Sequence, residues 1–386
     1  MSHDANLDIR YISNLMKLTE KLGITAPLKK SSRFKYYSFT IMTAIIIETV
    51  YSTHELWTSS SAMLFNGTSL VLRIFCILSF AIMNVVTMVV AVLNAETWIT
   101  FMKLFQFIDC KLNKGQTIVS PAKSNLKMEL LFWHCLMFCF FGYDGYLWYT
   151  NNGLAWLKFY ICTYINAYYG AITVLLVAHF ASAIRERFKR VNNILIKTNG
   201  LRNVINAFIS NGAADKINNL QNTDEVTECY LLLTELVDMF NKLFGWQIFF
   251  MTVNIVVQIL EIVNGLMNDV VYSQGSSNVL YDSRIVIFLV ASLLLILFLH
   301  ARVVIFCEDI NNESRNTLTI CYNLQQTVDP NSDDRKELII LGDLVDLLKP
   351  KTNAARYYDI NRGLLSRVFG YLISYSIVII QFSKQQ

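Results

Sequence analysis

The sequence predicts an all-α membrane protein with seven transmembrane helices, a cytoplasmic amino terminus and an extracellular carboxyl terminus. Hydrophobic residues make up 54% of the 386 residues and charged residues only 16%, and the mean hydropathy is +0.39. Average soluble domains carry about 25% charged residues. Two further observations support the membrane class: the apolar residues form long runs, and most basic residues lie in the amino-terminal segment and in alternate connections between these runs.

Seven mainly apolar stretches have the length of about 20 residues or more that a helix needs to cross a bilayer. The predicted spans are Tyr37–Trp57, Thr68–Leu93, Leu130–Thr150, Trp156–Ile184, Leu243–Met267, Arg284–Cys307 and Leu364–Phe382. They divide the chain into a cytoplasmic segment, spans one to four, a cytoplasmic extension, spans five and six, a second cytoplasmic segment, and the last span with its short extracellular tail. These parts cover residues 1–36, 37–184, 185–242, 243–307, 308–363 and 364–386.

The distribution of basic residues predicts the orientation. The amino-terminal segment and the connections after spans two, four and six hold 27 of the 33 Lys and Arg residues. The connections after spans one, three and five hold none. Because Lys and Arg are retained on the cytoplasmic side during insertion, the amino terminus should lie inside the cell and the carboxyl terminus outside. This orientation is opposite to that of G-protein-coupled receptors.

The cytoplasmic connections should be partly helical. Apolar residues recur at helical spacing in Phe180–Lys197 and Val226–Phe244, so spans four and five are expected to continue into the cytosol as long helices. A third amphipathic helix is predicted over Lys336–Leu348, ending near Pro350. These helices are expected to form a cytoplasmic anchor domain. Asn199–Thr223 is rich in Asn and Gly and is the predicted flexible loop.

One glycosylation site is predicted on the outside. Asn66-Gly67-Thr68 is an acceptor triplet in the first outer connection, so Asn66 is the candidate for glycosylation. Asn312-Glu313-Ser314 is also such a triplet, but the predicted topology places it in the cytosol, where it would not be modified.

No motif in the sequence indicates an enzyme. It contains no glycine-rich phosphate loop, no HExxH and no GxSxG pattern. The eight cysteines fall in apolar runs or in predicted cytoplasmic segments, so no disulfide framework, metal site or cofactor is expected. The topology also explains the basic residues without a nucleic-acid partner.

Four segments resemble those of insect gustatory receptors. The last span ends in Tyr-Ser-Ile-Val-Ile-Ile-Gln-Phe, which is similar to the family's signature of Thr-Tyr, about five mostly apolar residues and Gln-Phe. Ser374 stands where the family usually has Thr. The segments that carry the resemblance are Phe188–Leu195, Asp238–Gly245, Ile360–Leu365 and Tyr375–Phe382.

The resemblance implies a tastant-gated, nonselective cation channel in the plasma membrane of sensory neurons. Members of this family assemble as homo- or heterotetramers in which the seventh helix of each subunit lines the pore. A pocket in each subunit opens to the outside and receives a small-molecule tastant. The family's sugar-receptor branch tends to have Glu where this chain has Ser376, which favours a bitter or other ligand outside the classical sugars.

The last span has features of a pore helix. Polar residues interrupt its apolar surface, and such groups should face a water-filled lumen or a subunit interface rather than lipid. A constriction made of apolar side chains can close a pore by dewetting, whereas an amide helps to solvate a passing cation. The alternative is that Gln381 sits in an interface and Phe382 anchors in the membrane. The candidate pore and gate residues are Tyr375, Ile379, Gln381 and Phe382.

A ligand pocket is expected among the outer halves of spans three, four and five. Aromatic walls with a few polar groups are typical of small-molecule sites. The candidate pocket residues are Tyr143, Asp144, Tyr146, Tyr164, Tyr168, Gln258 and Glu261. An acid in the middle of a bilayer costs about 2.5–3.5 kcal/mol, so Asp144 and Glu261 should face either a hydrated pocket or a structural polar partner. Trp148 and Tyr160 fit either a pocket or a membrane-interface belt.

Three other function classes remain as alternatives. An odorant-receptor relative would need a partner subunit to conduct. A G-protein-coupled receptor would need an outside amino terminus, against the distribution of basic residues. A transporter built from duplicated halves would carry an internal repeat, and none is evident.

Overall fold

The computed structural model describes residues 15–27, 32–58, 67–112, 126–152, 157–209, 223–273 and 283–383. Nearly all of these residues are helical. The helices are α2 (Ser32–Thr58), α3 (Gly67–Leu93), α4 (Ala95–Leu112), α5 (Leu126–Asn152), α6 (Leu157–Ile209), α7 (Thr223–Ser273), α8 (Ser283–Thr327), α9 (Asp333–Leu348) and α10 (Arg362–Ser383). Two short strands, β1 (Asn353–Ala354) and β2 (Tyr358–Asp359), pair antiparallel between α9 and α10.

The described residues of each predicted span fall within one helix; Trp156, the first residue of the fourth span, lies outside the described residues. By length and apolar composition, five helices among the described residues can cross a membrane, and these are parts of α3, α5, α6, α7 and α8. The predicted first and last spans lie in α2 and α10, which have 27 and 22 residues. At about 1.5 Å per residue both exceed a hydrocarbon core of about 30 Å. Each of them carries a charged residue within its predicted span, Glu48 in α2 and Arg367 in α10.

Three helices are much longer than a bilayer requires. Helices α6, α7 and α8 have 53, 51 and 45 residues, which confirms the predicted extension of spans four and five. The extension of α8 beyond Cys307 and the separate helix α4 were not predicted. The loop prediction is wrong for residues 199–209, where α6 continues to Ile209; the rest of that predicted loop, residues 210–222, lies outside the described residues.

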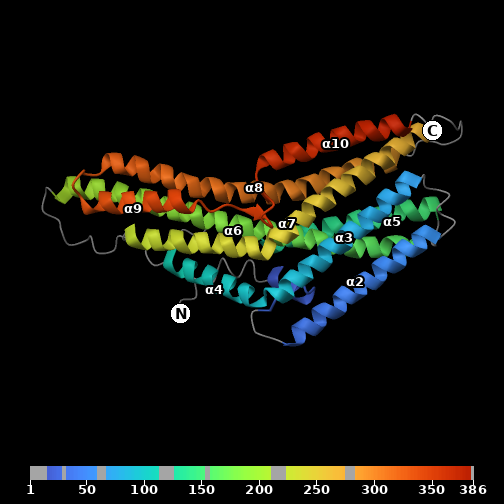
Figure 1. Ribbon diagram of the computed structural model, residues 1–386, viewed down its shortest axis with the longest axis horizontal. Helices are drawn as coiled ribbons and strands as arrows, with labels where there is room; N and C mark the ends of the chain where they lie inside the picture. Colours follow the sequence, from blue (N-terminus) through green and yellow to red (C-terminus); the bar gives the residue numbers. More distant parts are fainter. Residues whose placement is uncertain are drawn as a thin grey trace.

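The helices pack differently at their two ends (Figure 1). In the packed half, α4 and α9 lie against the long extensions of α6, α7 and α8. In the splayed half, α2, α3, α5 and α10 fan out with the remaining parts of the long helices. The predicted orientation would place the packed half in the cytosol.

An aromatic cluster forms the centre of the packed half. Trp98 and Phe101 from α4 contact Phe180 from α6 edge to face, with ring centroids 5.8 and 5.4 Å apart. Phe244 from α7 meets Trp98 in the same manner at 5.3 Å. All four side chains are buried. Edge-to-face contacts add to the free energy of burial, so this cluster joins α4, α6 and α7.

Polar groups in the packed half are paired across helices. Arg187 on α6 donates a hydrogen bond of 2.6 Å to Asp109 on α4, and both side chains are 2% exposed. The Arg187 guanidinium also lies 3.9 Å from the ring centre of Phe105. Tyr230 shares a hydrogen bond of 2.8 Å with Ser314, and burial raises the pKa of its phenol to about 12. These contacts hold α4 against α6 and α7 against α8.

The predicted helix over Lys336–Leu348 is present as α9 and begins three residues earlier, at Asp333. The Ser332 hydroxyl accepts a hydrogen bond from the backbone N–H of Arg335, which caps the first turn. Lys349 takes a left-handed conformation and ends the helix just before Pro350. The chain then turns back through the β1–β2 hairpin and enters α10.

Candidate functional site

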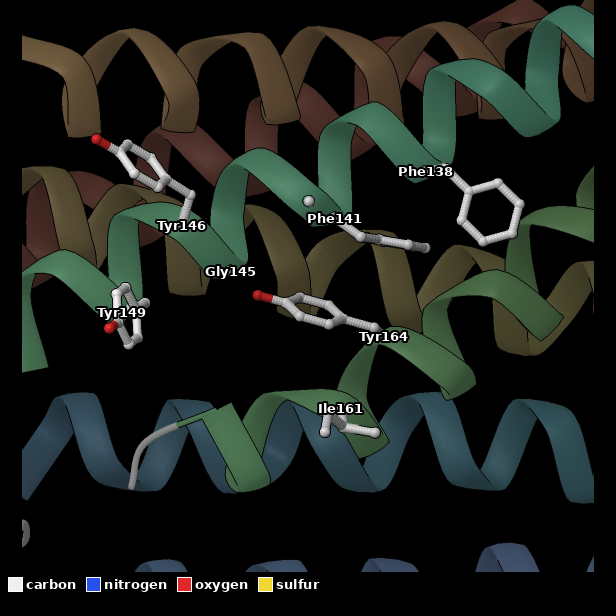
Figure 2. Close-up of a pocket in the computed structure, with 8 residues that line it drawn as sticks. Phe138, Phe141, Gly145, Tyr146, Tyr149, Ile161 and Tyr164 are labelled. Carbon is white, nitrogen blue, oxygen red and sulfur yellow. The ribbon is translucent and has the colours of Figure 1, made fainter. Parts of the chain in front are cut away.

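The candidate site is a cavity between α5 and α6 in the splayed half (Figure 2). Its volume is about 490 Å³. Most of its wall is aromatic, and two glycines of α5 leave room on that side. The lining residues are Phe138, Phe141, Gly142, Gly145, Tyr146, Tyr149, Ile161 and Tyr164. A cavity of this size with aromatic walls suits a small, largely apolar or aromatic molecule.

Tyr164 carries the polar contact of this cavity. Its hydroxyl donates a hydrogen bond of 2.6 Å to the carboxylate of Asp144 on α5. Its ring stacks on Phe141, with centroids 5.1 Å apart and planes 22° apart. Figure 2 shows these two rings lying one above the other between the helices. Asp144 therefore has a structural partner, and its carboxylate lies next to the cavity wall rather than in it.

The structure brings two of the predicted pocket residues, Tyr146 and Tyr164, to the cavity wall. Tyr168 lies beside it, where its ring stacks on His134 and lies 6.2 Å from the ring of Phe138. Tyr143 lies toward α8 instead, with its ring 5.7 Å from that of Phe288. The spacing of aromatic residues along α5 did not reveal which of them turn toward α6.

Glu261 lies at a different interface, and Gln258 is buried about one turn earlier on the same helix. Both are on α7, which packs closely against α3. Arg73 on α3 donates a hydrogen bond to Glu261 and forms an ion pair with it. Close by, Ser79 on α3 donates a hydrogen bond of 2.7 Å to Asn254 on α7. The predicted pocket residues are thus divided among the α5–α6 cavity, the contact of Tyr143 with α8 and the polar α3–α7 interface.

A second cavity of about 590 Å³ lies on the other side of α5, against α8. Its polar contact is the ion pair between Arg302 and Glu129, at 2.8 Å. None of the predicted pocket residues lines it. Among the described residues, the α5–α6 cavity therefore matches the sequence prediction better.

Helix α10 packs on α7 and α8 with one face only. Val368 is buried with Ile255 and Ile259 of α7. Most other described side chains of α10 are exposed, including Tyr375 and Gln381. The backbones of Ile379 and Phe382 belong to the helix, but their side chains lie outside the described residues, as do those of Trp148 and Tyr160. Asn66 also lies outside the described residues.

Two side chains that contact the predicted pocket residues were not predicted from the sequence. Arg73 is the ion-pair partner of Glu261, and a basic residue in the outer part of a predicted span was the available signal. Phe141 stacks on Tyr164, but nothing in the sequence distinguishes it from the other phenylalanines of α5.

Comparison with known families decides the class of protein. The family model for the seven-transmembrane chemosensory receptors matches residues 20–386. The chain belongs to the chemosensory receptor family. Among curated protein sequences, none matches this receptor.

Two solved structures share the fold of the receptor. The insect olfactory receptor OR5 from Machilis hrabei matches with a TM-score of 0.63 at 12% identity, covering 98% of this chain and 100% of that one. The same protein in complex with eugenol matches with a TM-score of 0.57 at 11% identity, covering 97% and 99%. The predicted all-α fold with seven transmembrane helices is confirmed for the receptor.

Proposed function

We propose that the receptor is a gustatory receptor that acts as a tastant-gated, nonselective cation channel. Four subunits, identical or mixed with other gustatory receptors, surround a pore lined by α10. The complex resides in the plasma membrane of sensory neurons, with Asn66 on the outside as a glycosylation site. Family membership supports the receptor class, and one feature of α10 supports the channel.

The observation that carries the channel proposal is the uncovered face of α10. Tyr371, Ile373 and Tyr375 are 65%, 62% and 56% exposed within the subunit. Polar side chains, among them Ser374 and Gln381, interrupt the same helix. Polar groups that face lipid are costly, so this face is better suited to a hydrated lumen and to neighbouring subunits. Gln381 and Phe382, near the end of α10, are the proposed gate.

The proposed tastant site is the α5–α6 cavity. Its aromatic wall favours a flat apolar or aromatic molecule, and the Tyr164 hydroxyl next to Asp144 supplies a polar contact. OR5 in complex with eugenol supports a small organic ligand for a receptor with this fold. A bitter compound fits this wall better than a sugar, which would need more hydrogen-bonding groups.

Recording current from cells that express the chain alone tests the channel proposal. A panel of bitter compounds and sugars is applied while G-protein signalling is blocked. The proposal predicts rapid cation currents with at least one compound. Silence across the panel, with the protein confirmed at the cell surface, would contradict a channel that works without a partner.

A second candidate is an olfactory receptor that conducts only with a partner subunit. The fold shared with an olfactory receptor favours it. The two candidates differ in the partner that restores a current: a requirement for an olfactory-receptor subunit would support the second, whereas current from the chain alone or with another gustatory receptor would support the first.

A further inference from the structure

The short segment between α9 and α10 is fastened to α7. The side chain of Asn241 on α7 donates a hydrogen bond of 2.8 Å to the carbonyl of Lys351 and accepts one of 3.0 Å from the backbone N–H of Asn353. Further along α7, Thr252 accepts a hydrogen bond of 2.8 Å from the hydroxyl of Tyr358. The β1–β2 hairpin therefore contacts α7 at two separate points.

The turn of the hairpin lies directly on the backbone of α7 at Gly245. A Cβ atom added to Gly245 would lie 2.8 Å from the backbone nitrogen of Ala355 and 3.2 Å from its Cα atom. Ala355 and Arg356 form the turn with positive φ angles of 50° and 66°. Because the atoms opposite Gly245 are backbone atoms, they cannot swing aside as the end of a side chain could. Any side chain at this position must displace the hairpin.

The base of the hairpin is fastened to α8. Thr352 donates from its backbone N–H to Asn311, at 3.0 Å, and from its hydroxyl to the carbonyl of Cys307, at 3.1 Å. The backbone N–H of Ile360 donates to the carbonyl of Thr352 at 3.0 Å, which closes the base. Thr352 and Ile360 are fully buried. The segment is thus held between α7 and α8 immediately before α10 begins.

The first turn of α10 is held by two carboxylates of α8, one of which also pairs with α6. The carboxylate of Glu308 on α8 accepts a hydrogen bond of 2.9 Å from the backbone N–H of Arg362 and pairs with its guanidinium at 3.1 Å. Asp309 on α8 pairs with Arg362 at 3.4 Å and with Arg185 on α6 at 3.1 Å. Asn361 caps the helix by accepting from the N–H of Leu364. Negative charge at a helix amino terminus also stabilises it.

The helices that hold this segment also contact neighbours of the α5–α6 cavity: α7 packs on α3, which contacts α6, and α8 contacts α5. Helix α7 is continuous from Gly245 to Glu261, which pairs with α3. Helix α8 is continuous from Phe288, which contacts Tyr143, to Glu308. Both helices therefore run without a break from contacts in the splayed half to the start of α10.

We propose that residues 352–362, here named the clasp, position the start of α10 and pass movements of α7 and α8 on to it. Gly245, Glu308 and Arg362 are the positioning residues. The proposal rests on the proposed function, in which α10 lines the pore. Beyond that function, it identifies the clasp as the place where a movement caused by ligand binding reaches the pore helix.

The first test compares two glycine substitutions. Gly245→Ala forces the clasp away from α7, whereas Gly342→Ala in α9 meets only side-chain atoms, the nearest at 3.4 Å. In cells, Gly245→Ala should shift the ligand concentration for half-maximal current by about fivefold or more, the lower end of typical coupling between sites. The fraction of current without ligand should change, while unitary conductance and surface amount stay as in the parent. Gly342→Ala should leave all four values unchanged.

A second set of variants uses the ion pair at the start of α10. Glu308→Gln and Arg362→Gln should each shift the half-maximal concentration, and the double variant should shift it by less than the product of the two single shifts. Independent effects of the two substitutions would overturn the proposal. Gating values equal to those of the parent in all variants at Gly245, Glu308 and Arg362 would also overturn it. This set also serves if Gly245→Ala fails to reach the surface.

Hydrogen–deuterium exchange of the purified receptor tests the positioning role of the clasp independently of the channel function. The amides of the first turn of α10 should exchange faster in Gly245→Ala than in the parent or in Gly342→Ala. Equal exchange in all three proteins would overturn the positioning role even if the receptor conducts. A parent that gives no current in any cell, together with faster exchange in Gly245→Ala, would contradict the proposed function and retain the positioning role of the clasp.

Discussion

Helices α6, α7 and α8 each run through two regions that are packed in different ways. In the packed half their facing sides are buried, and polar groups such as Arg187 and Asp109 are paired within the core. In the splayed half large aromatic side chains remain exposed, among them Phe138, Tyr146 and Tyr375. The difference indicates that one half holds the helices in a fixed arrangement, while the other leaves surfaces for lipid and, in the proposed function, for ligand and neighbouring subunits.

The largest effect is expected from breaking the buried ion pair of the packed half. Arg187→Met leaves the carboxylate of Asp109 buried without its partner, which should destabilise the receptor by about 3–5 kcal/mol. We expect loss of folded protein in size-exclusion chromatography. The double variant Arg187→Met with Asp109→Leu removes both charges and should recover much of the yield. Recovery no better than in the single variant would contradict this role of the pair.

A comparison of two phenylalanines measures the difference in packing directly. Phe244→Leu removes contacts with Trp98 and Phe180 at 5.3 and 5.6 Å and should lower the free energy of unfolding by about 2 kcal/mol. Phe138→Leu, at a side chain that is 67% exposed, should change it by about 0.5 kcal/mol or less. Thermal unfolding of the purified variants checks both values. Equal losses would show that the two halves do not differ in this way.

The polar interface between α3 and α7 gives an intermediate effect. Glu261→Gln deprives Arg73 of its charged partner and should cost about 1.5 kcal/mol of stability. Arg73→Gln should cost a similar amount, and the double variant less than the sum of the two. Dose–response curves of the same variants test the predicted ligand role, since a pocket role for Glu261 requires a shift in ligand sensitivity.

The smallest effect is expected at the α5–α6 cavity. Tyr164→Phe removes the donor to Asp144 but keeps the ring that stacks on Phe141. We expect a loss of about 1 kcal/mol of ligand binding free energy, which is roughly a fivefold higher half-maximal concentration. Tyr149→Phe removes a hydroxyl from the same cavity wall and serves as the matched control. Equal dose–response curves for the parent and Tyr164→Phe would remove this hydroxyl from the site.

The sequence predicted the helices well because their signals are local or are sums over many residues. The length of the apolar runs predicted the spans, and the periodicity of Val226–Phe244 predicted the extension of α7. The pairing of Arg73 with Glu261 joins residues far apart in the chain and depends on how α3 packs against α7. The hairpin likewise needs Gly245 opposite its turn, a close approach that no local pattern in Asn353–Asp359 reveals.

In the proposed function, α10 lines a cation pore. Single-channel recording of the purified receptor in lipid bilayers, with the parent and Gln381→Ala compared under the same ligand, tests it most directly. We expect a changed unitary conductance or ion selectivity in Gln381→Ala with assembly unaffected, because the amide would face passing cations. Identical conductance, selectivity and gating in the two proteins would contradict the claim.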